Sequence, residues 1–242
     1  MSARGFSGKA SGAIRLSPSA LNLYRDCPRC FWLEKVRFLK RPRGIFPSLP
    51  SGMDRVIKTY FDSFRAQGTL PPELRVKEFE NTTLFADQAR LDLWREWRTG
   101  LEFKDEDGSV MFGALDDLMV TGDAYIPFDY KTKGSPANME DTIRYYQNQI
   151  DCYALMLEAN GMKSAGYGYF LYYSPGKVGE KGWVNFHLQA FRVDVDTRRA
   201  RQTLRSAVEL MRQPEAPDSA PACEYCEYLH KMNRYHSRQA AE

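Results

Sequence analysis

Three charged residues are spaced so that a hairpin would bring their side chains together. Asp116 closes the segment Gly113-Ala114-Leu115-Asp116 in one predicted strand, and Asp129 and Lys131 lie one residue apart on the next. Because strand side chains alternate between two faces, Asp129 and Lys131 point to the same face, which Asp116 can reach across the turn. Two carboxylates beside an ammonium suit a hard divalent cation, which prefers oxygen ligands. The alternative interpretation is a surface ion pair on a hairpin.

Gln149 and Tyr153 lie on a predicted helix over residues 138–160, which ends before Gly161. They are four residues apart, so both side chains share one helical face and can point at the same hairpin. On its own, such a pair is more typical of one surface residue and one core residue.

Four of the five cysteines form two CxxC pairs at opposite ends of the chain, Cys27 with Cys30 and Cys223 with Cys226. An odd number of cysteines without a secretory signal argues against a disulfide framework. Two CxxC pairs can instead hold a tetrahedral zinc ion or a [4Fe–4S] cluster, which would fasten the two ends together. The remaining interpretation is four buried, unliganded cysteines. Cys152 is predicted to be a small core residue.

The elements that must position these residues follow from the periodicity of apolar side chains and from turn residues. We expect a flexible lead over residues 1–13 and a single domain over 14–242. Thr121-Gly122-Asp123 and Pro175-Gly176 are predicted turns. The predicted helices cover residues 18–25, 53–64, 84–97, 138–160 and 196–211, and the predicted strands cover 110–120, 124–131, 167–173 and 183–193.

The overall charge of the 242-residue chain is nearly balanced, with 34 Lys and Arg against 31 Asp and Glu. The formal charge of +3 neither establishes nor excludes a nucleic-acid partner, so the position of the charges matters more. Basic residues cluster in Glu34–Gly44, with Phe31, Trp32 and Phe38 nearby. This segment is either a solvated charged face or a nucleic-acid contact. No apolar run approaches the roughly 20 residues of a membrane-spanning helix, so we expect a cytoplasmic protein without a membrane partner.

Taken in order, Gly113-x-x-Asp116, Asp129-x-Lys131 and Gln149-x-x-x-Tyr153 resemble the PD-(D/E)XK nuclease superfamily, and within it the RecB-type and CRISPR-adaptation exonucleases. The segment LSPSALNLYRDCPRCFWL also resembles the start of those proteins, and the C-terminal cysteines are a further match. The resemblance implies an α/β fold in which helices flank a central mixed sheet and a cysteine clasp joins the two ends of the chain.

The resemblance also implies a role for each residue of the hairpin. Asp116 and Asp129 would bind Mg²⁺ or Mn²⁺, with the Tyr130 carbonyl as a further ligand. Lys131 would orient or deprotonate the attacking water and offset charge on the phosphate. Gln149 and Tyr153, which complete the implied site, would position the DNA or the active-site groups.

The sequence departs from the family pattern in two places. RecB-type members carry a metal-binding histidine on an upstream helix, but residues 50–56 contain no histidine, and Asp54 is the nearest candidate ligand. Related exonucleases hold an iron–sulfur cluster with one N-terminal and three C-terminal cysteines, whereas this chain has two and two. We favour an iron–sulfur cluster over zinc. His230 and His236 are alternative ligands near the second pair.

The sequence therefore predicts a metal-dependent nuclease that hydrolyses DNA phosphodiester bonds, as an exonuclease in repair, recombination or defence. Its substrate would be DNA, with single strands as one option, and a helicase or another DNA-processing protein is a candidate partner. One alternative is a catalytically inactive DNA-binding or scaffold subunit of the same fold. The other is a zinc-stabilised interaction protein.

Overall fold

The computed structural model describes residues 12–98 and 100–239. Its main sheet has five strands in the order β2-β5-β6-β7-β8, and a smaller sheet has the order β1-β4-β3. The strands are β1 (Arg15–Leu16), β2 (Thr83–Leu84), β3 (Leu101–Lys104), β4 (Val110–Gly113), β5 (Asp117–Thr121), β6 (Ala124–Thr132), β7 (Tyr167–Val178) and β8 (Val184–Asp194). The helices are α1 (Pro18–Asp26), α2 (Pro28–Arg37), α3 (Ser48–Ala66), α4 (Gln88–Arg95), α5 (Met139–Ala159), α6 (Thr197–Met211) and α7 (Glu224–Gln239).

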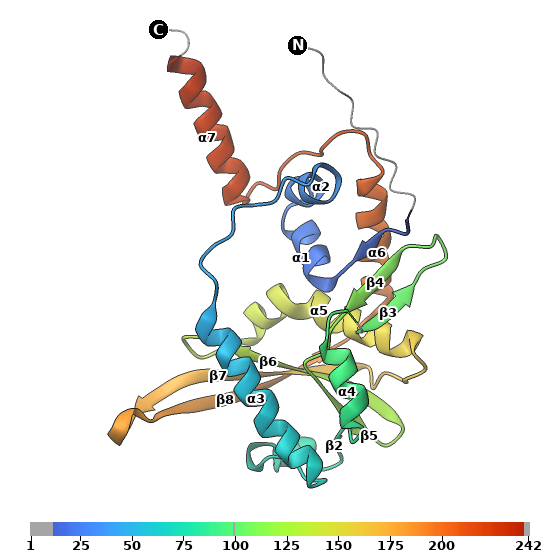
Figure 1. Ribbon diagram of the computed structural model, residues 1–242, viewed down its shortest axis with the longest axis vertical. Coiled ribbons are helices and arrows are strands. Elements are labelled where there is room, and N and C mark those ends of the chain that lie inside the picture. Colours follow the sequence, from blue (N-terminus) through green and yellow to red (C-terminus); the bar gives the residue numbers. More distant parts are fainter. Residues whose placement is uncertain (1–11, 99, 240–242) are drawn as a thin grey trace.

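The main sheet is mixed. Strands β5 and β6 form an antiparallel hairpin, β6 and β7 are parallel, and β7 and β8 are antiparallel. Two parallel neighbours need a crossover connection, and α5 supplies it between β6 and β7 (Figure 1). The expected α/β fold with helices around a mixed sheet is confirmed.

Two hydrophobic cores lie on opposite faces of the main sheet, and the alternation of side chains along β6 divides between them. Ile126, Phe128 and Tyr130 pack on the face that α3 covers. The intervening Asp129 and Lys131 turn to the other face, where α5 lies, and contact Gln149 there. The period-2 pattern of β6 therefore delivers both charged groups to the α5 side.

Side-chain caps begin the helices that the sequence predicted near the site. The hydroxyl of Ser17 accepts from the backbone N–H of Ala20 at the start of α1. Asn138 caps α5 and Asp196 caps α6 in the same way. Gly161, at φ +79°, follows the end of α5. These helix positions match the predictions to within a few residues.

The predicted strand over residues 110–120 is wrong, because the chain changes sheet in its middle. Val110–Gly113 pairs with β1 and β3, whereas Asp117–Thr121 pairs with β2 and β6. Between them, the backbone N–H of Leu115 donates to the carbonyl of Trp94. A Cβ atom at Gly113 would lie 3.2 Å from Pro18 and Met156 side-chain atoms, so glycine allows α1 and α5 to approach this strand.

Two other boundaries differ from the prediction. Residues 84–97 do not form one helix, since β2 ends at Leu84 and α4 begins only after Asp87, whose side chain caps it. Pro175-Gly176 is not the turn of the last hairpin. Pro175 still pairs with Phe186, and the chain reverses over residues 179–183, so β7 and β8 extend well beyond the sheet (Figure 1).

Helix α7 projects away from the body of the molecule (Figure 1). Among its residues only Cys226 is buried. Neither α2 nor α7 was predicted. Most of the predicted lead, residues 1–11, lies outside the described residues. No helix within the described ranges is long and apolar enough to cross a membrane.

Candidate active site and cysteine clasp

Asp129 and Lys131 meet the helix α5 at the carboxyl end of β6. The Asp129 side chain is fully buried and forms an ion pair with Lys131. Gln149 donates from Nε2 to Asp129 Oδ1 at 2.9 Å and to the Tyr153 hydroxyl oxygen at 2.7 Å. The ammonium of Lys131 donates to Gln149 Oε1 at 3.1 Å. One amide thus holds the carboxylate, the ammonium and the phenol in fixed relative positions.

Asp116 enters the site from the break between β4 and β5. The Nε–H of Arg95 donates to the Asp116 carbonyl oxygen at 2.8 Å, which fixes the backbone there. The carboxylate Oδ1 accepts from the Lys58 ammonium at 2.8 Å, and the same ammonium donates to Asp54 Oδ2 at 3.0 Å. The three predicted carboxylates, those of Asp54, Asp116 and Asp129, therefore lie close together: Lys58 links Asp54 to Asp116, and Asp116 lies beside Asp129.

Lys58 was not predicted as a site residue. Its ammonium bridges Asp54 and Asp116, so a cation already lies between two candidate metal ligands. The sequence does contain a signal for it, because Asp54 and Lys58 are four residues apart on a predicted helix and must share a face. Asp54 remains the more exposed partner, with 42% of its side chain exposed.

The electrostatics of the two central carboxylates differ. Burial and the neighbouring Asp116 raise the pKa of Asp129 to about 8. Burial acts in the same direction on Asp116, but Lys58 and Lys131 together lower its pKa. Burial opposes the charge of Lys131, yet Asp129 and Asp116 raise the pKa of its ammonium. Of the two carboxylates, Asp129 is therefore the one whose negative charge is less well stabilised by its surroundings.

This donor set fits a hard divalent cation. The Oδ2 atom of Asp129 is buried and faces the Lys131 ammonium, and Asp116 lies close enough to raise the pKa of the Asp129 carboxyl. Carboxylate oxygens are the ligands that Mg²⁺ and Mn²⁺ prefer. A bound cation would offset the repulsion between the Asp116 and Asp129 carboxylates that this raised pKa reflects.

Tyr130 lies between Asp129 and Lys131, and its side chain turns to the opposite face. There its hydroxyl donates to Asp117 Oδ2 at 2.5 Å. Asp117 is fully buried and also accepts from Arg65 at 2.6 and 2.7 Å and from Arg95 at 3.2 Å. This ionic cluster beneath the site was not predicted, since its arginines come from α3 and α4.

Two hollows give access to the site. One of about 480 Å³ is lined by Gln149, Tyr153 and residues of α1 that include Asn22. Another of about 250 Å³ is lined by Asp54, Lys131 and Tyr146. The polar groups at the end of β6 can therefore be reached from both sides of the predicted carboxylate cluster.

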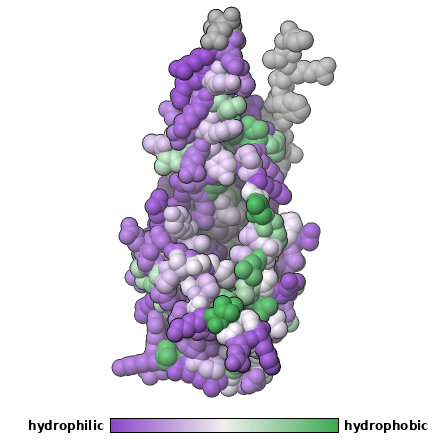
Figure 2. Space-filling view, turned by 90° about the vertical axis from the view of Figure 1, so that its left-hand side faces the viewer, coloured by the Kyte–Doolittle hydropathy of each residue, from purple (hydrophilic) through white to green (hydrophobic). Residues whose placement is uncertain are grey.

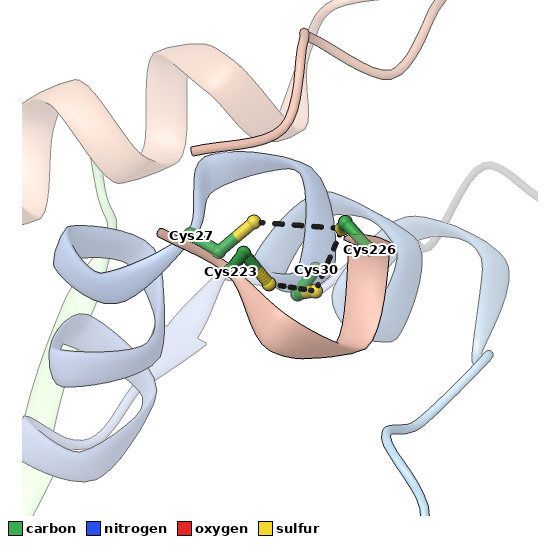
Figure 3. Close-up of side chains that lie close together, drawn as sticks. All are labelled: Cys27, Cys30, Cys223 and Cys226. Carbon is green, nitrogen blue, oxygen red and sulfur yellow. Dashed lines mark hydrogen bonds between the residues drawn. The ribbon is translucent and has the colours of Figure 1, made fainter. Parts of the chain in front are cut away.

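The four paired cysteines lie together, as the sequence predicted. Figure 3 shows Cys27 and Cys30, at the corner of α1 and α2, facing Cys223 and Cys226 at the start of α7. All four are buried, and their sulfur atoms lie within 4.8 Å of one another. The cysteine clasp formed by these residues joins the N-terminal and C-terminal parts of the chain. Cys152 is buried in the main core instead.

The surroundings of the clasp act differently on its thiols: burial raises the pKa of Cys30 and Cys226, whereas that of Cys27 is lowered. Burial raises the pKa of Cys27, but hydrogen bonds from the backbone of Cys30 and Ala220 outweigh it and bring the pKa to about 7. The guanidinium of Arg41 donates to Cys223 Sγ at 3.3 Å. Four converging sulfurs with a nearby cation are able to bind a metal. The candidate ligands His230 and His236 lie on exposed positions of α7, and the cluster within the described residues contains only the cysteines.

A family model described as the PD-(D/E)XK nuclease superfamily matches residues 49–230, more than half of the chain. The matched range contains every carboxylate discussed above and the second cysteine pair, and it begins after Cys27 and Cys30. No curated protein matches the sequence.

Proposed function

The chain belongs to the PD-(D/E)XK nuclease superfamily, and from this premise we propose that it is a metal-dependent nuclease that cleaves DNA phosphodiester bonds. Members of the superfamily are generally hydrolytic nucleases. The observation that carries the proposal is the meeting of the Asp116 and Asp129 carboxylates with the Lys131 ammonium, where burial and the neighbouring Asp116 raise the pKa of Asp129.

In the proposed site, Asp116 and Asp129 hold Mg²⁺ or Mn²⁺, with the Tyr130 carbonyl and Asp54 as further ligands. The bound ion supplies a nucleophile near neutral pH and offsets charge on the phosphate. The four oxygens differ in how tightly they are placed. Asp129 is fixed by Gln149, whereas Asp54 is half exposed and held through Lys58.

Lys131 contributes a positive charge next to the reacting phosphate. Its side chain is only 16% exposed and its ammonium is fixed by Asp129 and Gln149, so it needs little reorganisation when a phosphate arrives. Asp129 and Asp116 raise the pKa of this ammonium. A cation bound by those carboxylates would lower that pKa and increase the fraction of neutral amine, which is the form that can accept a proton from water. Gln149 and Tyr153 position these groups.

The finer proposal is an exonuclease that acts in DNA repair, recombination or defence in the cytoplasm, beside a helicase or another DNA-processing protein. It is supported by the order of motifs shared with RecB-type and CRISPR-adaptation exonucleases and by the cysteine clasp.

One observation favours the inactive-subunit alternative. Lys58 lies between Asp54 and Asp116, on the helix where RecB-type members carry a histidine ligand. A lysine there is a competitor of the metal rather than a ligand. A protein that binds DNA and never cleaves it would fit this arrangement.

We also propose that the cysteine clasp holds a metal centre. A tetrahedral ion with Zn–S bonds of about 2.3 Å separates its sulfurs by about 3.8 Å. Three of the six sulfur pairs of the clasp lie at 3.5, 3.6 and 3.9 Å, close to that value, and all six lie within 4.8 Å. A four-iron cluster needs more room between the sulfurs. The spacing therefore supports zinc over the iron–sulfur cluster that the sequence favoured, and elemental analysis with visible absorption of the purified protein distinguishes them.

The proposed function is tested with end-labelled single-stranded DNA and Mg²⁺ or Mn²⁺. Wild-type protein should shorten the DNA, and cleavage should vanish with a chelator or in the Lys131→Ala variant. Equal cleavage by Lys131→Ala would refute the assignment of this site. Binding of DNA without cleavage by any sample would support the inactive-subunit alternative.

A further inference from the structure

A third hollow runs from the cysteine clasp to the candidate active site. It measures about 700 Å³ and is lined by residues of α1 and α5, by Arg41 and by Ala222. It shares Asn22 with the hollow beside Gln149 and Tyr146 with the hollow beside Lys131. Figure 2 views the side of the molecule on which α5 begins and shows the surface hollowed near its middle. The three hollows therefore adjoin one another, and the surface that they form, which includes Lys131 and Gln149, is called the groove below.

The floor of this groove is basic. Arg25, Arg41 and Arg144 line the third hollow. Asp26 is the only acidic residue in its described lining, and Arg41 pairs with it at 2.6 Å. Arg25 and Arg144 are both exposed. Because Asp26 is paired with Arg41 and Asp141, beside Arg144, is paired with Lys133, the lining keeps an excess of positive charge, as a site for a polyanion requires.

Aromatic rings connect the basic floor to the catalytic lysine. The guanidinium of Arg144 lies 5.3 Å from the ring centre of Tyr145, which is 54% exposed. The rings of Tyr145 and Tyr146 are 6.4 Å apart, and the Lys131 ammonium lies 4.6 Å from the centre of the Tyr146 ring. An exposed aromatic ring between cations is the arrangement on which single-stranded bases stack while their phosphates meet positive charge.

We propose that this groove binds one strand of DNA, with a base stacked on Tyr145 and adjacent phosphates on Arg144 and Arg25, and guides it to Lys131. The inference rests on the proposed nuclease function and names the form of its substrate. A duplex hides its base faces, so Tyr145 would gain nothing from it. The hollow beside Asp54 and Lys131 has a volume of only about 250 Å³, which also suits a single nucleotide better than a double helix.

The test measures binding of a fluorescent single-stranded oligonucleotide by anisotropy without added divalent cation, so that binding is separated from cleavage. Tyr145→Ala and Arg144→Ala should each weaken binding about fivefold or more, and Tyr145→Trp should retain it, because stacking needs a ring rather than a hydroxyl. The matched controls are Tyr235→Ala, at an equally exposed tyrosine on α7, and Arg198→Ala on α6. Both should bind as wild type does.

A duplex of the same sequence should bind more weakly than the single strand and should not distinguish Tyr145→Ala from wild type. Wild type that binds the single strand while Tyr145→Ala binds it equally well would overturn this inference and leave the nuclease proposal intact. Equal weakening by Tyr235→Ala would also overturn it, because the effect would then be unspecific. Wild type that binds no oligonucleotide would overturn both proposals.

Discussion

Asp116 and Asp117 are neighbours in the chain, yet they belong to two different ionic clusters. Asp117 is fully buried under the sheet and receives hydrogen bonds from Arg65, Arg95 and Tyr130. Asp116 faces the α5 side, where Asp129 adds a second negative charge beside it. The Asp117 carboxylate accepts hydrogen bonds from three side chains, whereas the Asp129 carboxylate has one amide hydrogen bond and the ion pair with Lys131 and lies beside the negative charge of Asp116.

The difference separates a structural from a functional use of buried charge. A carboxylate with a full set of hydrogen-bond donors stabilises the folded state. Its removal leaves the buried groups that donate to it without an acceptor or counter-charge. A carboxylate short of positive charge costs stability and gains from a ligand that supplies the charge. Two adjacent aspartates should therefore respond oppositely to mutation, one in stability and the other in activity.

The largest expected effect on stability follows from Asp117→Ala. The variant leaves the buried guanidinium groups of Arg65 and Arg95 without their shared carboxylate, so it should lose about 3–5 kcal/mol of unfolding free energy. Urea denaturation measures this loss. The matched control is Asp116→Ala. In this variant Lys58 still pairs with Asp54, so the loss of unfolding free energy should be less than about 1 kcal/mol. Similar losses of unfolding free energy in the two variants would show that the two ionic clusters do not differ in their contribution to stability.

A smaller effect is expected from Tyr130→Phe. The change removes the hydroxyl that donates to Asp117 and keeps the ring and the backbone carbonyl. A hydrogen bond to a charged group contributes about 1.5–3 kcal/mol, so unfolding free energy should fall by that amount. Cleavage should persist when it is assayed well below the unfolding midpoint. Loss of cleavage in a folded variant would show that the two clusters are coupled.

The smallest effect concerns Asp105, a third buried aspartate. Hydrogen bonds from Arg205 and Arg201 hold its pKa well below the usual 3.8. Because the folded-state pKa is depressed, this carboxylate stabilises the protein above about pH 4 and loses that contribution as the pH falls further. Asp105→Asn should cost only about 1 kcal/mol near neutral pH, since both arginines are partly exposed.

The measurement for Asp105 is the unfolding free energy of wild type and Asp105→Asn between about pH 7 and pH 3. The gap between the two curves should stay constant above about pH 5 and narrow as the pH falls below about 4, because the unfolded chain then takes up a proton that folded Asp105 still resists. A gap that stays constant down to about pH 3 would show that the pKa of Asp105 is not depressed in the folded protein.

The parts of the molecule that were predictable depend on local patterns. The β5–β6 hairpin follows from its turn residues, and the placement of Asp129 and Lys131 follows from period-2 alternation. The α5 face that carries Gln149 and Tyr153 follows from helical spacing. The meeting of the four cysteines was predictable from the spacing of the two CxxC pairs, because this spacing is typical of a shared metal site.

The parts that were missed depend on contacts between distant segments. Strand β1 has only two residues and pairs with β4 about 95 residues later, so no local period reveals it. The partners of Asp117 come from α3 and α4, and nothing near Asp117 in the sequence indicates them. The change of sheet between β4 and β5 is equally non-local. The apolar residues of β4 and β5 follow one another closely and both strands are largely buried, so the sequence pattern predicts a single strand.

The most direct test of the account uses Asp116→Asn and Asp117→Asn side by side, with cleavage of end-labelled single-stranded DNA and unfolding free energy measured on the same preparations. We expect Asp116→Asn to lose less than about 1 kcal/mol of unfolding free energy and to have lost cleavage, because an amide is a poor replacement for a carboxylate ligand. Asp117→Asn should be clearly destabilised and should retain cleavage wherever it is folded. Cleavage by Asp116→Asn at the wild-type rate would contradict the account.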